Sequence, residues 1–247
     1  MVPDDRGAHL FESLTRALAA RGLDVWIPLD AAAFDAACAP VASSLTLEAL
    51  LPGARSALVV GSAGRVFFDA FSRAREAGDS LPNPLDRYTR VIVGEAARAA
   101  LEPLGVRHVE RFPFLGGDAD GLVIPFQRLG RAAGLAPASP LGLQIHPAHG
   151  AWWAYRALIV VDAALPEAPP LFDACTGCPA PCVEACPGAA VRRDGFSVAA
   201  CHAHRLVDEA CHRSCVARIA CVRAPERRYS DAQLAFHMAA SMPRAPA

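Results

Sequence analysis

The sequence predicts an α/β (α+β) protein with a large α/β domain followed by a small cysteine-rich domain. Apolar runs of strand length, as at 54–61, alternate with segments whose apolar residues recur at helical spacing, as at 64–74. Eight of the nine cysteines lie between Cys175 and Cys221, behind a proline-rich stretch at 164–173. The expected parts are therefore 1–170, 171–224 and a terminal helical segment, 225–247, that packs back on the large domain.

The elements of the large domain follow from local patterns. Leu10, Leu14 and Leu18 recur at helical spacing, and Asn83 with Pro84 is typical of a helix N-terminus. In chain order, the expected helices are 8–21, 30–38, 46–51, 64–74, 83–101 and 125–134, and the expected strands are 23–27, 54–61, 108–114, 140–147 and 151–161. A capping-box pattern starting at 230 predicts one more helix near the C-terminus.

Composition excludes several classes of protein. The chain has 247 residues, of which 53% are hydrophobic and 20% charged, so it is globular and not disordered. A net charge of −1 gives no general attraction to nucleic acid or anionic lipid. No apolar run reaches the roughly 18 residues of a membrane span. Residues 1–20 lack the charged and apolar regions of a signal peptide, so we expect a cytoplasmic protein.

The spacing of the cysteines predicts iron–sulfur clusters. Residues 175–187 read C-x2-C-x3-C-x3-C-P, one residue longer in the second gap than the bacterial ferredoxin run. Eight thiolates suit two [4Fe-4S] clusters, which take four each. In two-cluster ferredoxins the cysteine before the proline ligates the other cluster. This rule assigns Cys175, Cys178, Cys182 and Cys221 to a first cluster, and Cys186, Cys201, Cys211 and Cys215 to a second.

Other uses of these cysteines stay open at this point. Disulfides require an oxidising compartment. A zinc site would combine Cys178 and Cys182 with Cys211 and Cys215, and His202, His204 and His212 lie close by in the sequence. Some cysteines could also be small buried hydrophobic residues, the interpretation we favour for the isolated Cys38.

Several stretches of the chain resemble one known family. Three of these stretches look like CblC: Leu51-Pro-Gly53, Ile145-His146-Pro147 with Gly150, Trp152 and Arg156, and Arg228-Tyr229-Ser230 with Gln233. A fourth stretch, Asn83–Tyr88, resembles CblC more weakly. The cysteine order, in which Cys201 comes fifteen residues after Cys186, resembles epoxyqueuosine reductase. The sequence thus resembles the family of CblC-type cobalamin-processing proteins, epoxyqueuosine reductases and reductive dehalogenases.

The resemblance implies a fold and an activity. The expected fold is a nitroreductase/flavin-reductase-like core with a C-terminal ferredoxin-like domain. The expected protein is a corrinoid-binding iron–sulfur oxidoreductase, in which an external donor (a ferredoxin, a flavodoxin or a reductase) supplies electrons through two [4Fe-4S] clusters to base-off cobalamin. That activity would serve removal of the upper cobalamin ligand or reduction of a small substrate.

The resemblance also implies site residues. Cobalamin would contact His146, Gly150 and Trp152, while Arg156 and Arg228 match arginines that bind glutathione in CblC. The competing interpretations are a structural turn for His146, plain core for one of the two neighbouring tryptophans, and ordinary surface ion pairs for the arginines.

Two further residues match proton donors. Asp120 has the placement of the proton-donating aspartate of epoxyqueuosine reductases, and Tyr88 could supply a second proton or cap the pocket. A solvated turn aspartate is the competing interpretation of Asp120.

Three other functions stay open. A tRNA-modifying epoxyqueuosine reductase is one, but the chain is shorter than that family and lacks room for its tRNA-binding helical repeats, so we do not expect nucleic acid as a partner. The same fold binding FMN is the second. A non-enzymatic binding module stabilised by zinc or clusters is the third.

Overall fold

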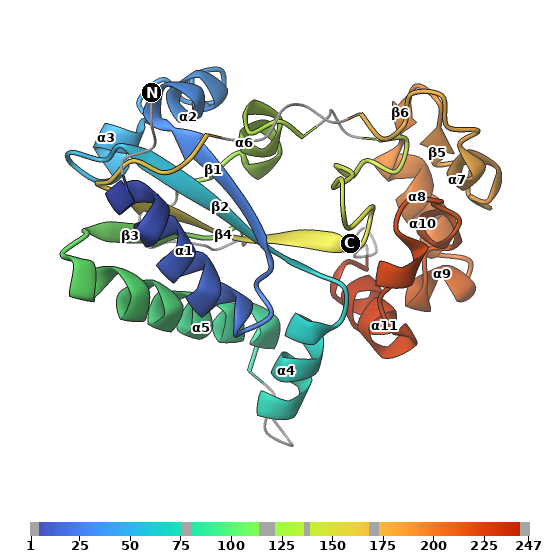
Figure 1. The fold of residues 1–247 in the computed structure, drawn as a ribbon. Coiled ribbons are helices and arrows are strands. Elements are labelled where there is room, and N and C mark those ends of the chain that lie inside the picture. The colour runs from blue at the N-terminus through green and yellow to red at the C-terminus, as the bar shows by residue number, and fades with distance from the viewer. Residues whose placement is uncertain (1–4, 76–80, 114–121, 136–138, 168–172, 243–247) are drawn as a thin grey trace. The chain divides into compact units, whose positions relative to one another are not determined.

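The computed structural model describes residues 5–75, 81–113, 122–135, 139–167 and 173–242. The chain divides into two compact units (Figure 1). We call Met1–Gly134 with Ala154–Leu171 the core unit, and Leu135–Trp153 with Phe172–Ala247 the cysteine unit. The segment Leu135–Trp153 thus lies with the cysteines, whereas the sequence pattern grouped it with the large domain.

A four-stranded sheet forms the centre of the core unit. Its strands are β1 (Val25–Asp30), β2 (Ser56–Ala63), β3 (His108–Arg111) and β4 (Trp153–Val161), in the order β1-β2-β4-β3. The outer pairs are antiparallel, with Val25 opposite Gly61 and His108 opposite Val161. Every residue of β2 is buried, as its apolar run at 57–60 predicts for a central strand.

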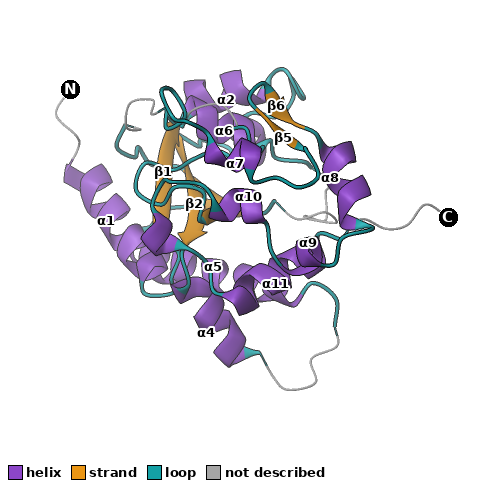
Figure 2. Cartoon of the chain, turned by 90° about the vertical axis from the view of Figure 1, so that its right-hand side faces the viewer, coloured by secondary structure: helices purple, strands orange, loops and turns teal. Residues whose placement is uncertain are grey.

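Six helices in the described part of the chain belong to the core unit, and four of them form two pairs that cover this sheet. The helices are α1 (Asp5–Ala19), α2 (Ala31–Cys38), α3 (Leu47–Leu50), α4 (Val66–Ala74), α5 (Pro84–Leu101) and α6 (Phe126–Ala132), with a 3-10 turn η1 at Glu102–Leu104. The pair α1 and α5 pack together, and α2 and α6 pack together against β1 and β2. Figures 1 and 2 show these pairs on opposite faces of the sheet. The core unit is therefore the layered α/β structure that the sequence predicts.

Local sequence explains where these helices begin. The Asp30 carboxylate accepts a hydrogen bond from the Ala33 amide at 2.7 Å at the start of α2. Asn83 is the N-cap residue of α5 and Pro84 is its first residue, as the sequence predicts, but the cap geometry differs from that of Asp30. Asn83 adopts a left-handed conformation (φ 53°), and its side chain makes no capping hydrogen bond. Asparagine tolerates this conformation better than most residues, so it redirects the chain into Pro84.

The strand expected at 140–147 is also absent from the described residues. The chain there forms turns, and its only strand-like pairing is an isolated bridge between His146 and Gly150. The tight approach of these two residues closes a loop, so the apolar residues of 140–147 pack into the cysteine unit instead of extending the sheet.

The cysteine unit is built from short elements. They are α7 (Pro181–Glu184), β5 (Val191–Arg192), β6 (Gly195–Phe196), α8 (Val198–Arg205), α9 (Ala210–Arg213), α10 (Val216–Ile219), the 3-10 turn η2 (Pro225–Arg227) and α11 (Asp231–Ala240). Ser230 caps α11, with its hydroxyl accepting from the Gln233 amide at 3.2 Å, as the capping pattern predicts. We expected α11 to pack on the large domain; within its own unit it packs against α9.

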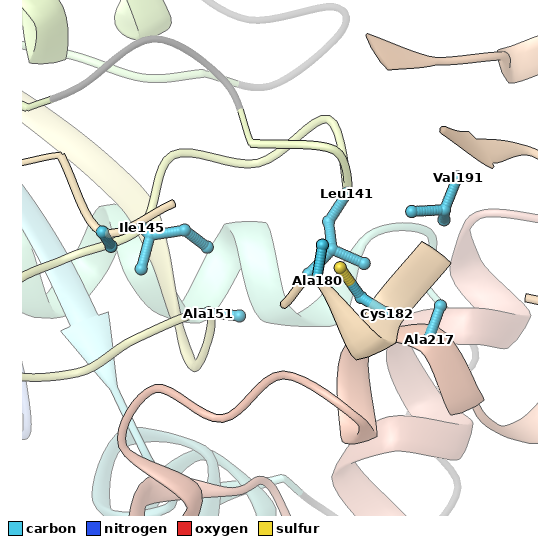
Figure 3. Close-up of a cluster of buried hydrophobic side chains, with 8 residues drawn as sticks. Leu141, Ile145, Ala151, Ala180, Cys182, Val191 and Ala217 are labelled. Carbon is cyan, nitrogen blue, oxygen red and sulfur yellow. The ribbon is translucent and has the colours of Figure 1, made fainter. Parts of the chain in front are cut away.

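A small apolar cluster lies at the centre of the cysteine unit. Figure 3 shows the Cys182 side chain beside Ala180 and Leu141, with Ala217 nearby. Four partly buried cysteines pack against the same cluster, which also includes Ile145. The predicted ligands are therefore part of this unit's own core. No helix among the described residues is long and apolar enough to cross a membrane.

Candidate metal centres and cofactor site

The eight clustered cysteines form two separate groups in space. The first quartet surrounds a cavity of about 340 Å³ and the second a cavity of about 450 Å³. The first quartet is Cys175, Cys178, Cys182 and Cys221, and the second is Cys186, Cys201, Cys211 and Cys215. This is the grouping that the ferredoxin rule predicts, in which the cysteine before the proline joins the other group.

Tight turns position the first quartet. The Asp173 carboxylate accepts hydrogen bonds from the amides of Cys175 (2.8 Å) and Thr176 (3.2 Å), which fixes the start of the run. The Cys178 amide then donates to the Cys175 carbonyl at 3.0 Å, and the Ala180 amide lies 3.4 Å from the Cys178 sulfur. Short loops of this kind direct several sulfurs and amides toward one centre.

Short helices position the second quartet. Cys201 lies on α8, which Ser197 caps by accepting from the Ala200 amide at 3.2 Å. Cys211 lies on α9, and Cys215 is the first residue before α10. Cys186 comes two residues after the end of α7. Four different elements therefore contribute one thiol each.

Burial raises the pKa of the thiol in Cys175, Cys182, Cys201 and Cys211, and the sulfurs of the same quartet raise these pKa values further. Four thiolates this close together repel one another unless positive charge lies between them. All nine cysteines are free thiols. A quartet of neighbouring, unbridged thiols fits iron of a [4Fe-4S] cluster or zinc, both of which bind thiolate.

The zinc site considered from the sequence would mix the two groups. Cys178 and Cys182 belong to the first quartet, and Cys211 and Cys215 to the second, so these four do not surround one cavity. A different mixed set does come together at the second quartet. Ligand atoms of His204, Asp208 and Cys211 all lie within 4.8 Å of one another.

His146 has the properties of a neutral hydrogen-bond donor. Its Nδ1 accepts from the Ala148 amide at 3.2 Å, which leaves the proton on Nε2. Burial, and to a smaller extent the neighbouring His149, stacked at 4.5 Å between ring centroids, lower the pKa of His146 to about 4. The ring is therefore uncharged at neutral pH, and its Nε2–H can donate to a carbonyl or amide oxygen.

Gly150 and Trp152 are explained by packing within the cysteine unit. A Cβ on Gly150 would lie 2.2 Å from the Arg223 carbonyl oxygen, so this close approach requires glycine. The Trp152 side chain is fully buried under Tyr229, at 5.5 Å between ring centroids, and under the Arg218 guanidinium, at 4.9 Å. A corrin contact for either residue stays a prediction.

Arg228 also serves the internal structure of this unit. Its guanidinium donates to the Ile219 carbonyl at 2.6 Å, near the end of α10. This contact joins the turn η2 to the helix that precedes Cys221. Binding of an anionic ligand by Arg228 stays a prediction.

Arg156 is a buried cation in the core unit, with 6% of its surface exposed. Its Nε donates to the Ser62 hydroxyl at 2.8 Å, and its guanidinium lies 4.8 Å from the centre of the Phe67 ring. The Tyr88 ring packs 5.7 Å from Phe67, and burial raises the pKa of its hydroxyl. Arg156 and Tyr88, both predicted from the sequence, thus come together around one aromatic ring.

Sequence reasoning missed a carboxyl group in the same place. Asp86 is half-buried, and burial raises its pKa although Arg156 and Arg90 act in the opposite direction. It lies two residues before Tyr88, in a stretch that was noted only for its resemblance. The predicted proton donor Asp120 lies outside the described residues.

Sequence reasoning also missed Arg205, an arginine beside the second quartet. Arg205 and Arg218 both line its cavity. Arg205 follows Cys201 by four residues on one helix, a spacing that places two side chains on the same face. That spacing is a signal that could have identified Arg205.

Comparisons with known proteins find this fold elsewhere. No protein-family model and no curated protein matches the chain. Among solved structures, an epoxyqueuosine reductase aligns with a TM-score of 0.61 at 14% identity, over 91% of this chain and 68% of its own. An epoxyqueuosine reductase solved with an epoxyqueuosine-modified tRNA stem loop gives 0.56 at 15% identity, over 91% and 68%.

The third comparison covers nearly all of both proteins. The B12-trafficking protein CblC of C. elegans aligns with a TM-score of 0.58 at 14% identity, over 95% of this chain and 92% of its own. At such identities the likeness extends to the fold alone. It confirms the α/β class, and at that level it agrees with the resemblance seen in the sequence.

Proposed function

We propose that this chain is an iron–sulfur oxidoreductase that binds a corrinoid. The observation that carries the proposal is the separation of eight thiols into two quartets, each around its own cavity. When bound, two [4Fe-4S] clusters supply one-electron transfer, and cobalamin supplies a cobalt centre that accepts electrons. An external donor, a ferredoxin, a flavodoxin or a reductase, provides the electrons. A cytoplasmic location is part of this proposal, because eight cysteines that bind metal as thiolates require a reducing compartment.

Three residues of the chain would take part in this function, His146 in the cysteine unit and Arg156 with Asp86 in the core unit. Neutral His146 donates a hydrogen bond through Nε2 to an oxygen of the corrin side chains. Arg156 is held rigidly by Ser62 and Phe67, and it offers a buried positive charge to an anion such as the glutathione thiolate. Asp86 has a raised pKa and can hold a proton beside that charge.

A spectrum of the anaerobically purified protein tests the proposal. We expect a broad brown absorbance that bleaches with dithionite and, on addition of hydroxocobalamin, a shift to the base-off form. The His146→Gln variant should keep the brown absorbance and bind cobalamin more weakly, because glutamine places its amide differently. A colourless, zinc-containing protein contradicts the iron–sulfur part. Retained FMN without a cobalamin shift supports the flavin alternative.

Modification of tRNA is the second candidate function. The observation in its favour is the fold shared with an epoxyqueuosine reductase solved with a tRNA stem loop. The net charge of −1 opposes it, because backbone phosphates dominate the affinity of proteins for nucleic acid. A gel-shift assay with a tRNA stem loop tests this second function. We expect no binding at physiological salt, and binding would favour tRNA modification.

A further inference from the structure

Arg205 lies in direct reach of the second quartet. It is four residues after Cys201 on α8, and both residues line the same cavity. Only 5% of its surface is exposed. Buried arginines carry their full charge, so the protein must compensate this one from within.

The end of α11 holds the two terminal nitrogens of this guanidinium. Nη1 donates to the Ser241 carbonyl at 2.8 Å, and Nη2 donates to the Met238 carbonyl at 2.6 Å and lies 3.1 Å from the Met242 sulfur. Carbonyls at a helix C-terminus suit a cation, because they lie at the negative end of the helix dipole. These contacts fix the side chain in one orientation.

The third nitrogen has no such partner. Nε of Arg205 is buried, and no hydrogen-bond acceptor contacts it among the residues that the structure describes. A buried N–H of a charged group that makes no hydrogen bond destabilises the folded protein. Most buried polar groups are paired, so an unpaired N–H on a cavity wall indicates an acceptor that belongs in the cavity.

We propose that Arg205 donates an Nε–H hydrogen bond to a sulfur of the second cluster and raises that cluster's reduction potential above that of the first. This inference rests on the proposed function, in which the second quartet binds a [4Fe-4S] cluster. Reduction adds one negative charge to a cluster. A buried positive charge and an N–H directed at sulfur both stabilise the reduced form.

The first quartet has no comparable neighbour among the described residues that line its cavity. Its charged neighbours Asp173, Arg193 and Arg223 are all exposed, so water and salt screen them. The two clusters therefore differ in potential in a defined order.

A redox titration of the two-cluster protein, followed by electron paramagnetic resonance, tests this inference. The Cys211→Ser variant identifies the signal of the second cluster. We expect Arg205→Gln to lower the second potential and to leave the first unchanged. Arg205→Lys keeps the charge but lacks Nε–H, so it should lower the second potential by less.

Arg213 offers a matched control. It lies between Cys211 and Cys215 but is exposed, so Arg213→Gln removes the same charge from a screened position. Its effect on the second potential should be smaller than that of either Arg205 variant.

Three results would overturn the inference. One is an unchanged second potential in Arg205→Gln with both clusters bound. Another is an equal shift in Arg213→Gln, which would show that any nearby charge suffices. If Arg205→Gln loses the second cluster, the Arg205→Lys variant is measured in its place. The third contradicting result is then an unchanged second potential in Arg205→Lys. A wild-type protein whose second quartet contains no iron overturns the proposed function itself, and this inference with it.

Discussion

In the core unit, α5 has 18 residues and all eight residues of β2 are buried, whereas in the cysteine unit α7, α9 and α10 have four residues each. Isolated helices shorter than about 12 residues are marginal in water. The core unit therefore gains its stability from burial of apolar side chains. The cysteine unit has only a small apolar cluster with cysteines packed against it, so under the proposed function we expect it to depend on the metal that its quartets bind.

Removal of the metal should produce the largest difference in stability between the two units. After chelation of iron, we expect backbone amides of 173–242 to exchange with solvent rapidly, because the short helices lose the bonds that fix them. Amides of β2 should stay protected. Hydrogen–deuterium exchange followed by mass spectrometry measures both regions in one sample. Equal protection of the cysteine unit with and without metal would contradict the comparison.

A cavity in the core unit should destabilise that unit and leave the metal sites of the cysteine unit unchanged. Leu58 on β2 is fully buried, and Leu58→Ala should lower the free energy of unfolding by about 2–5 kcal/mol. The iron–sulfur absorbance of the folded variant should not change. Val91→Ala on α5 is the control, because this side chain is 57% exposed and its loss should cost less than about 0.5 kcal/mol. Denaturation followed by circular dichroism measures both, and equal losses would count against burial as the cause.

The same contrast explains what could be predicted from the sequence. Periodicity located β2 and α5 because long, regular elements leave a pattern of apolar residues. Cysteine spacing predicted both quartets. The segment 140–147 was misjudged because its apolar residues pack among the cysteines. Arg205 was missed because its role depends on a cavity that only the folded chain creates.

Two histidines, one in each unit, should respond to pH in opposite directions. His146 of the cysteine unit has a pKa of about 4 in the folded chain, mainly because it is buried, whereas its ordinary pKa is 6.5. Between these two values the unfolded chain binds a proton at this residue and the folded chain does not, so acid favours unfolding. Stability should therefore fall by about 2 kcal/mol from pH 7 to pH 5 relative to His146→Gln.

His108 of the core unit behaves in the reverse manner. A hydrogen bond to Glu110 raises its pKa, so its contribution is complete at low pH and is lost as pH rises through the raised value. Midpoints of denaturation at pH 5 and pH 7, compared with His108→Gln, measure this effect. A loss of stability on acidification that persists in His146→Gln would assign the effect to another group.

Loss of one helix cap in each unit should give the smallest of these effects on stability. The Thr46 hydroxyl accepts from the Ala49 amide at 3.1 Å in the core unit, and Ser230 plays the same part for α11 in the cysteine unit. Each change to alanine should cost about 1 kcal/mol. Changes to glycine, which is tolerated at this position, should cost only a few tenths. The exchange rates of amides in α3 and α11 report each loss locally, and unchanged rates would show that the caps contribute nothing.

The content of iron and acid-labile sulfide tests the central claim most directly. The wild-type chain should contain about eight iron atoms, and Cys182→Ala and Cys201→Ala should each retain about four, because each removes one ligand from a different quartet. The variants should lose different paramagnetic signals. Zinc in place of iron, or the same signal lost in both variants, would contradict two independent cluster sites.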